Sequence, residues 1–172
     1  MNIIDKYKLV LELKDSIKSG RIHKKRNIYL VGKDKIAKEI YDEDKAKNEY
    51  EMGIFLFNQG VNVPQMHCLI KPFLFNPKIS YPNSRFIIME KINGIEYWHL
   101  DKKDKEKALP LYKKEIEKVL ELGIYPWDSL CSDNNKIFDY ENEKIYLIDF
   151  GGWRKGSIDE INGFYEKIEN LR

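Results

Sequence analysis

The chain has 172 residues, of which 42% are hydrophobic and 34% are charged, a balance typical of a folded globular domain rather than a disordered segment. Its 30 basic and 28 acidic residues leave a net charge of only +2, so the overall charge does not favour nucleic acid as a partner. No apolar run approaches the roughly 18 residues of a membrane span. The two cysteines are too few for a disulfide framework. We therefore expect a single cytoplasmic domain with no membrane partner.

The first half of the chain is expected to combine strands with a helix. From the amino end, the predicted elements are a helix or strand over 1–19, a β-hairpin of 27–31 and 35–41, a helix over 43–59, and strands over 65–71 and 86–90. Gly32-Lys33-Asp34 supplies the hairpin turn, and Gly60 with the later Pro64 ends the helix. Residues 72–84 are rich in Pro, Asn and Ser and are expected to form a loop.

The second half is expected to place a short hairpin between two helices. In chain order, the predicted elements are a helix over 110–122, a hairpin of 137–138 and 145–148, and a helix over 158–171. Pro110 is expected in the first turn of its helix, where a missing N–H is tolerated. The order of strands and helices along the whole chain predicts an α+β fold.

The strand over 35–41 carries a lysine between aliphatic neighbours. Because side chains alternate along a strand, Lys38 shares a face with Ile36 and Ile40, whereas Lys35 is expected on the opposite, solvated face. A lysine on an inward face needs an anionic partner. Glu49, on the apolar side of the following helix, is the predicted partner. The alternative is an edge-strand lysine that reaches solvent beside an ordinary surface glutamate.

Acidic residues in the second half suit the chemistry of phosphoryl transfer. Asp149 ends an apolar strand and enters the turn of Phe150 and Gly151, while Asp128 lies upstream of it. Phosphoryl transfer needs one carboxylate to hold Mg²⁺ on the nucleotide phosphates and another to orient the attacking hydroxyl. The alternative for Asp149 is a residue that only caps the turn after its strand.

Taken in order, these residues resemble the protein-kinase-like superfamily, in particular RIO kinases, the small kinase of the tRNA-threonylcarbamoyl complex, and aminoglycoside phosphotransferases. Gly60 to Pro64 resembles the Gly-x-x-x-Pro that follows the glutamate helix, and Phe86 to Gly94 resembles the strand and hinge that hold adenine. The resemblance covers roughly residues 20–155. It implies a minimal two-lobed fold, with an N-lobe over about 1–90, a reduced C-lobe over about 91–172, and a nucleotide in the cleft between them.

The resemblance also implies ATP and Mg²⁺ as cofactors and gives each site residue a role. The implied roles are phosphate binding by Lys38, orientation of Lys38 by Glu49, adenine binding at Glu90 and Ile92, positioning of the acceptor hydroxyl by Asp128, and metal binding by Asp149 with Asp133 or Asn134.

The chain departs from the pattern at several places. Pro126 replaces the His or Tyr two residues before the catalytic Asp, and Asp133 stands where the superfamily has Asn. No Gly-x-Gly-x-x-Gly loop is present; the basic run Arg21–Arg26 would instead hold phosphates by charge or form a small nucleic-acid patch. Only about twenty residues follow the Asp-Phe-Gly, which favours a small Ser/Thr kinase with a protein substrate or partner. A non-catalytic pseudokinase and a small-molecule kinase stay open.

Overall fold

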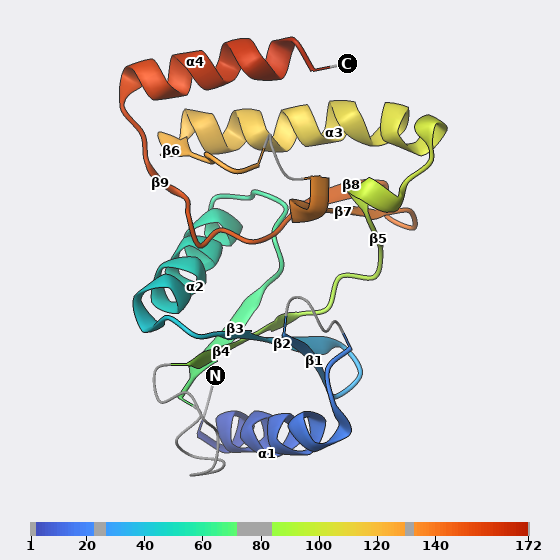
Figure 1. Cartoon of the computed structure of the whole chain (residues 1–172), viewed down its shortest axis with the longest axis vertical. Coiled ribbons are helices and arrows are strands. Elements are labelled where there is room, and N and C mark those ends of the chain that lie inside the picture. Colours follow the sequence, from blue (N-terminus) through green and yellow to red (C-terminus); the bar gives the residue numbers. More distant parts are fainter. Residues whose placement is uncertain (1–2, 23–26, 72–83, 130–132, 172) are drawn as a thin grey trace. The chain divides into compact units, whose positions relative to one another are not determined.

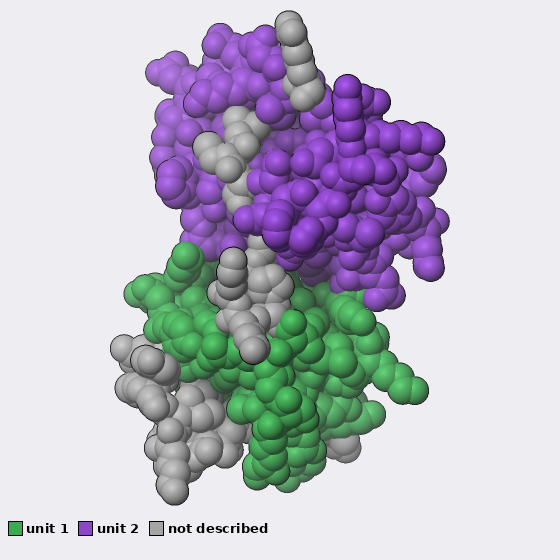
Figure 2. Space-filling view, turned by 45° about the vertical axis from the view of Figure 1, so that its right-hand side comes forward, with its two compact units in different colours: residues 1–51, 65–91 green, residues 52–64, 92–172 purple. Residues whose placement is uncertain are grey.

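The computed structural model describes residues 3–22, 27–71, 84–129 and 133–171, and Figure 1 shows the course of the chain. The chain divides into two compact units. The first comprises Met1–Glu51 with Gln65–Lys91, and the second comprises Met52–Pro64 with Ile92–Arg172 (Figure 2). The predicted α+β composition is confirmed, whereas the division into an N-lobe and a C-lobe stays a prediction. In the described part of the chain, no helix has both the length and the apolar character needed to cross a bilayer.

The first unit is built on a four-stranded antiparallel sheet with the strand order β1-β2-β4-β3. Its strands are β1 (Ile28–Val31), β2 (Lys35–Ile40), β3 (Met66–Ile70) and β4 (Arg85–Glu90), and each overlaps a strand predicted from the sequence. The segment that fits either a helix or a strand is a helix, α1 (Ile3–Ser19). Apart from Ser84, the loop predicted over 72–84 lies outside the described residues.

Both faces of this sheet are covered, which the sequence does not indicate. Helix α1 packs on one face, where Leu9 and Leu13 join a core that includes Ala37 (Figure 1). The beginning of α2 (Glu43–Asn58) contributes Ala46 to a second core on the other face. The prediction that the face of Ala37 is solvated is therefore wrong, because the apolar side of α1 excludes water from it.

The second unit contains two helices and short strands. Besides the end of α2, its elements are β5 (Ile95–Glu96), the 3₁₀ helix η3 (Tyr97–His99), α3 (Lys102–Glu121), β6 (Ile124–Tyr125), the 3₁₀ helix η4 (Asp133–Asn135), β7 (Lys136–Asp139), β8 (Lys144–Leu147), β9 (Arg154–Lys155) and α4 (Ile158–Glu169). Strands β5, β7 and β8 form one antiparallel sheet, and β6 pairs with β9. The predicted hairpin and final helix are both present.

Helix α3 begins at Lys102 rather than at Pro110. Asp101 caps it, since its side chain accepts a hydrogen bond from the backbone N–H of Asp104. Pro110 therefore lies inside the helix and not in its first turn. The missing N–H at Pro110 is tolerated because one face of the helix is buried on both sides of it, with Ala108 before it and Tyr112 after it.

Candidate active site

Lys38 and Glu49 form a buried ion pair within the first unit. The Lys38 Nζ donates to Glu49 Oε1 at 2.7 Å, and the two side chains are only 16% and 2% exposed. Strand β2 supplies the lysine on the side of the sheet that carries Ile40, and α2 supplies the glutamate from the helix that covers that side. The structure thus brings together the two residues that the alternation pattern predicted as partners.

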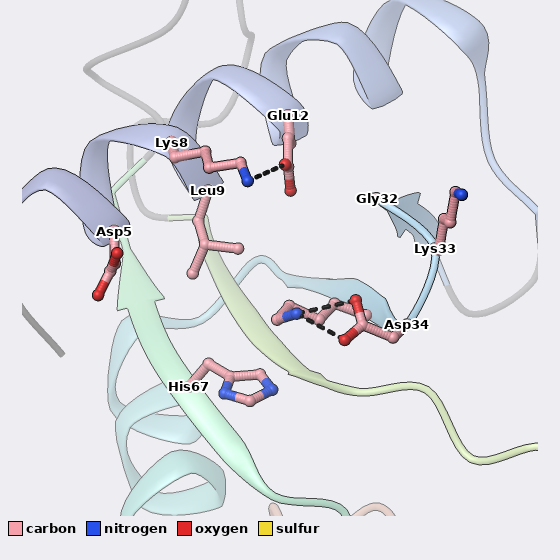
Figure 3. Close-up of a pocket in the computed structure, with 9 residues that line it drawn as sticks. Asp5, Lys8, Leu9, Glu12, Gly32, Lys33, Asp34 and His67 are labelled. Atoms are coloured by element: carbon pink, nitrogen blue, oxygen red, sulfur yellow. Dashed lines mark hydrogen bonds and ion pairs between the residues drawn. The ribbon is translucent and has the colours of Figure 1, made fainter.

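Lys35 is the counterpart of Lys38 on the opposite face of β2. Its Nζ lies 2.8 Å from Asp34 Oδ1, in a hollow of about 830 Å³ beside α1 (Figure 3). His67 also lines this hollow, and burial lowers its pKa. The hollow mixes acidic and basic side chains in comparable numbers and contains none of the predicted site residues.

Asp149 occupies an unusual backbone conformation at the end of β8. Its φ is +68°, in the left-handed region that costs an L-residue roughly 1–2 kcal/mol. The turn after it is closed by a hydrogen bond from the Trp153 N–H to the Phe150 carbonyl at 2.9 Å. Such strain is stored mainly where surrounding structure holds a residue for a functional purpose. The sequence predicted the turn, but not the strain at Asp149.

The pairing of β7 with β8 ends before Asp149. Lys136 pairs with Leu147, and the Ile148 N–H donates to the Asn135 carbonyl at 3.0 Å. Beyond this point the ladder does not continue, because Asp133–Asn135 form the 3₁₀ helix η4 and Asp149 has a left-handed backbone. Asp133 and Asn134 therefore both stay candidates for the second oxygen ligand of a metal at Asp149.

Asp133 is held by lysines. Its Oδ1 lies 3.2 Å from the Nζ of Lys136, and its Oδ2 lies 3.9 Å from the Nζ of Lys105. The side chain of Lys136 is only 5% exposed, and its ammonium lies 4.3 Å from the ring centre of Tyr112. Burial lowers the pKa of Lys136. A metal ion bound by Asp133 would compete with this buried lysine.

Asp128 lies in a turn that is anchored to α3. The Tyr112 hydroxyl donates to the Ser129 carbonyl at 3.0 Å, and burial raises the pKa of Tyr112. Asp128 Oδ1 accepts a hydrogen bond from the Trp153 indole Nε1 at 2.9 Å, so the segments around Asp128 and after Asp149 are joined directly. The sequence does not predict this contact, since no local spacing relates the two residues.

Glu90 and Ile92, the residues predicted to contact adenine, lie at and just beyond the end of β4. The Glu90 N–H donates to the Gln65 carbonyl at 2.9 Å, so its backbone could contribute to adenine binding only through its carbonyl. Within the basic run, residues 23–26 lie outside the described residues. Arg21 is described, and its guanidinium bonds the hydroxyl of Tyr29 at 3.1 Å.

No three acidic, histidine or cysteine side chains gather into a metal site among the residues that the structure describes. Mg²⁺ on a nucleotide does not need such a cluster, because one or two protein oxygens and the phosphates hold it. The residues present, Asp149 with Asn134 or Asp133, fit that requirement.

Comparisons with known proteins identify the fold. No protein-family profile and no curated protein matches the chain. Among solved structures, the Cydia pomonella granulovirus kinase PK-1 matches with a TM-score of 0.54 and 15% identity over 74% of this chain and 47% of that one. WbdD matches with a TM-score of 0.56 and 19% identity over 84% of this chain and 34% of that one. The chain has a protein-kinase-like fold and spans less than half the length of either structure.

Proposed function

We propose that the protein is an ATP- and Mg²⁺-dependent phosphotransferase. The observation that carries this proposal is the buried Lys38–Glu49 pair in a kinase-like fold. A buried ion pair adds little net stability over a pair of apolar residues, because both charges lose their hydration. Its presence is explained if the lysine is held ready for an anionic ligand such as the phosphates of a nucleotide.

The remaining site residues complete the requirements of the reaction. Asp149 and Asn134 would hold Mg²⁺, which lowers the charge repulsion among the phosphates when it is bound. Asp128 would orient the acceptor hydroxyl. The oxygen of the acceptor hydroxyl forms a bond to the γ-phosphorus, while the bond between that phosphorus and the ADP oxygen breaks. The hydroxyl proton passes to Asp128. The backbone carbonyl of Glu90 and the backbone of Ile92 would hold adenine.

We propose a Ser or Thr hydroxyl of a protein as the acceptor. Assays with casein and with small alcohols and amino sugars as alternative acceptors separate this class from a small-molecule kinase. The pairing of Asp133 with Lys136 favours one competing function, a pseudokinase that binds a protein partner, because the residue at the superfamily's metal-binding Asn position is then held by a lysine. Binding of Mg-ATP without turnover on any acceptor would support it.

The decisive experiment separates the structural role of the ion pair from its role in binding. Lys38→Met and Glu49→Met should each destabilise the fold by roughly 1–3 kcal/mol, since each removes one charge of the 2.7 Å ion pair and leaves the other in place. The double variant should recover most of that stability. It should nevertheless fail to bind Mg-ATP, whereas the parent at 100 times its dissociation constant should gain about 2.7 kcal/mol.

Lys35→Met is the matched control, since Lys35 lies on the same strand and pairs with Asp34. It should leave Mg-ATP binding unchanged. A double Lys38→Met, Glu49→Met variant that binds Mg-ATP as tightly as the parent would reject the proposed function.

A further inference from the structure

Trp153 is held rigidly in the core of the second unit. Its side chain is only 1% exposed, and its ring packs edge-on against Phe150 with centroids 5.2 Å apart. The backbone before and after it is fixed by the hydrogen bond to Phe150 and by the pairing of Arg154 with Tyr125. The indole N–H therefore points in one direction only.

The direction of that N–H is toward Asp128. Trp153 Nε1 donates to Asp128 Oδ1 at 2.9 Å. The Asp128 side chain is itself half-buried, on a turn that the Ser129 N–H closes onto the Pro126 carbonyl at 3.0 Å. A hydrogen bond from a buried donor restrains the carboxylate, because the donor hydrogen prefers to lie near the plane of the carboxyl group, and it thereby favours one orientation of the other oxygen.

We infer that Trp153 is a positioning residue, which orients the Asp128 carboxylate toward the acceptor hydroxyl. This inference rests on the proposed function. Phosphoryl transfer depends mainly on positioning, and a displacement of about 1 Å can cost roughly a hundredfold in rate. A residue that holds the orienting carboxylate should therefore affect turnover without affecting the binding of nucleotide.

A purely structural explanation also exists, because a buried indole N–H needs an acceptor and Asp128 would supply one. The two explanations differ in a testable way. If Trp153 acts through Asp128, its effect on turnover disappears once Asp128 is gone. If Trp153 only stabilises the fold, its effect is the same whether or not Asp128 is present.

Trp153→Phe keeps an aromatic ring against Phe150 and removes the donor. Turnover, measured with Mg-ATP and casein and as ATP hydrolysis, should fall roughly 10- to 100-fold. The KM for ATP should not change. In an Asp128→Ala background, Trp153→Phe should reduce the residual turnover no further. Trp98→Phe is the control, since Trp98 is exposed and donates to Glu96, and it should behave as the parent.

Each remaining outcome has a distinct meaning. Equal losses in the parent and Asp128→Ala backgrounds, or full turnover of Trp153→Phe beside an inactive Asp128→Ala, overturn the role of Trp153 and leave the proposed function standing. Full turnover of Asp128→Ala removes the proposed role of Asp128 and this inference with it. No turnover of the parent on water, casein, small alcohols or amino sugars removes the proposed function as well. If Trp153→Phe fails to fold, benzothienylalanine at position 153 replaces the N–H with sulfur in the same shape, and the same outcomes apply.

Discussion

At the scale of single residues, the site depends on conformations that only the folded chain imposes. Asp149 has a φ of +68°, in a turn that the Trp153 N–H closes onto the Phe150 carbonyl. Trp153 in turn donates from its indole to Asp128, 25 residues earlier in the chain. Neither feature follows from residue type or local spacing.

The variant Asp149→Asn tests whether Asp149 holds Mg²⁺. Asparagine nearly conserves the shape and tolerates the left-handed region, so the fold should survive. It carries no charge, so the extra ATP stabilisation that Mg²⁺ provides should be lost. Calorimetric titration with ATP, with and without Mg²⁺, measures this. Equal Mg-ATP affinity of parent and variant would contradict the proposed role and favour a residue that only caps the turn.

The choice between Asn134 and Asp133 is tested by a matched pair of variants. Asn134→Ala should weaken the Mg²⁺-dependent part of ATP binding about as much as Asp149→Asn. Asp133→Asn should affect it little, but should lower stability by about 1–3 kcal/mol, because Lys136 loses a charged partner. The measurements are the same titration and urea unfolding. If Asp133→Asn weakens Mg²⁺-dependent ATP binding and Asn134→Ala does not, Asp133 is the metal ligand.

The sequence predicted part of this site for clear physical reasons. Alternation along β2 placed Lys38 inward and pointed to Glu49, because strand and helix periodicities are local properties. The spacing from Asp128 does not separate Asp133 from Asn134, and it does not show that Lys105 on α3 lies 3.9 Å from Asp133. The Trp153–Asp128 bond was missed for the same reason, as it joins residues that are brought together only by tertiary structure.

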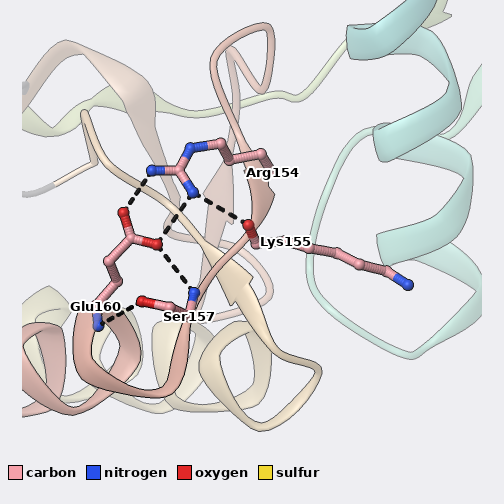
Figure 4. Close-up of polar contacts among 4 residues, drawn as sticks. All are labelled: Arg154, Lys155, Ser157 and Glu160. Carbon is pink, nitrogen blue, oxygen red and sulfur yellow. Dashed lines mark hydrogen bonds and ion pairs between the residues drawn. The ribbon is translucent and has the colours of Figure 1, made fainter.

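At the scale of elements, the segment after Gly151 is short and tied down. Strand β9 pairs with β6, and the Arg154 guanidinium binds Glu160 in the first turn of α4, with Nη1 and Oε2 3.0 Å apart (Figure 4). Ser157 and Glu160 also form a capping box, in which each side chain bonds the other's backbone N–H. The position of α4 is therefore coupled to the strand that follows Trp153.

This coupling predicts a dependence of stability on pH. The Arg154 guanidinium, with help from the Ser157 N–H, lowers the pKa of Glu160 from 4.5 to about 2. A lowered pKa stabilises the fold above pH 4.5, and this contribution is lost as the pH falls through about 2. Glu160→Gln should thus reduce the slope of the free energy of unfolding against pH between pH 4.5 and about 2. Asp159→Asn, one residue away, is the control and should keep the parent's slope.

Element boundaries were predicted less well than element types. The hairpins and α4 were found because their apolar periodicity is strong and local. The sequence predicts α3 too late, because proline is common in the first turn of a helix, whereas Pro110 lies inside α3. In the structure, the cap at Asp101 and the burial of Ala108 outweigh the lost hydrogen bond. The face of β2 covered by α1 was missed because nothing in a strand's own pattern shows which helix packs on it.

At the scale of the whole molecule, the proposed function draws on residues of both compact units. Lys38 and Glu49 belong to the first unit, whereas Asp128 and Asp149 belong to the second. Under the proposed function, the effect of nucleotide on local opening is therefore measured in each unit separately.

Hydrogen exchange tests this expectation. Mg-ATP should slow amide exchange in β2 and in residues 148–153, because bound ligand suppresses local opening at its contacts. The Lys38→Met, Glu49→Met double variant should lose protection in both segments, and Lys35→Met should keep it. Protection of one segment alone would show that nucleotide contacts only that unit.

The left-handed backbone of Asp149 has a consequence for laboratory evolution. Glycine, and to a lesser degree asparagine, adopts this conformation at lower cost than aspartate. A library selected only for resistance to heat would therefore tend to collect these residues at position 149, since proteins commonly give up stability where activity requires a strained residue. Under the proposed function, the glycine clones would have lost a metal ligand, and the asparagine clones would have lost its charge. Selection for heat resistance and selection for phosphoryl transfer would thus favour different residues at position 149.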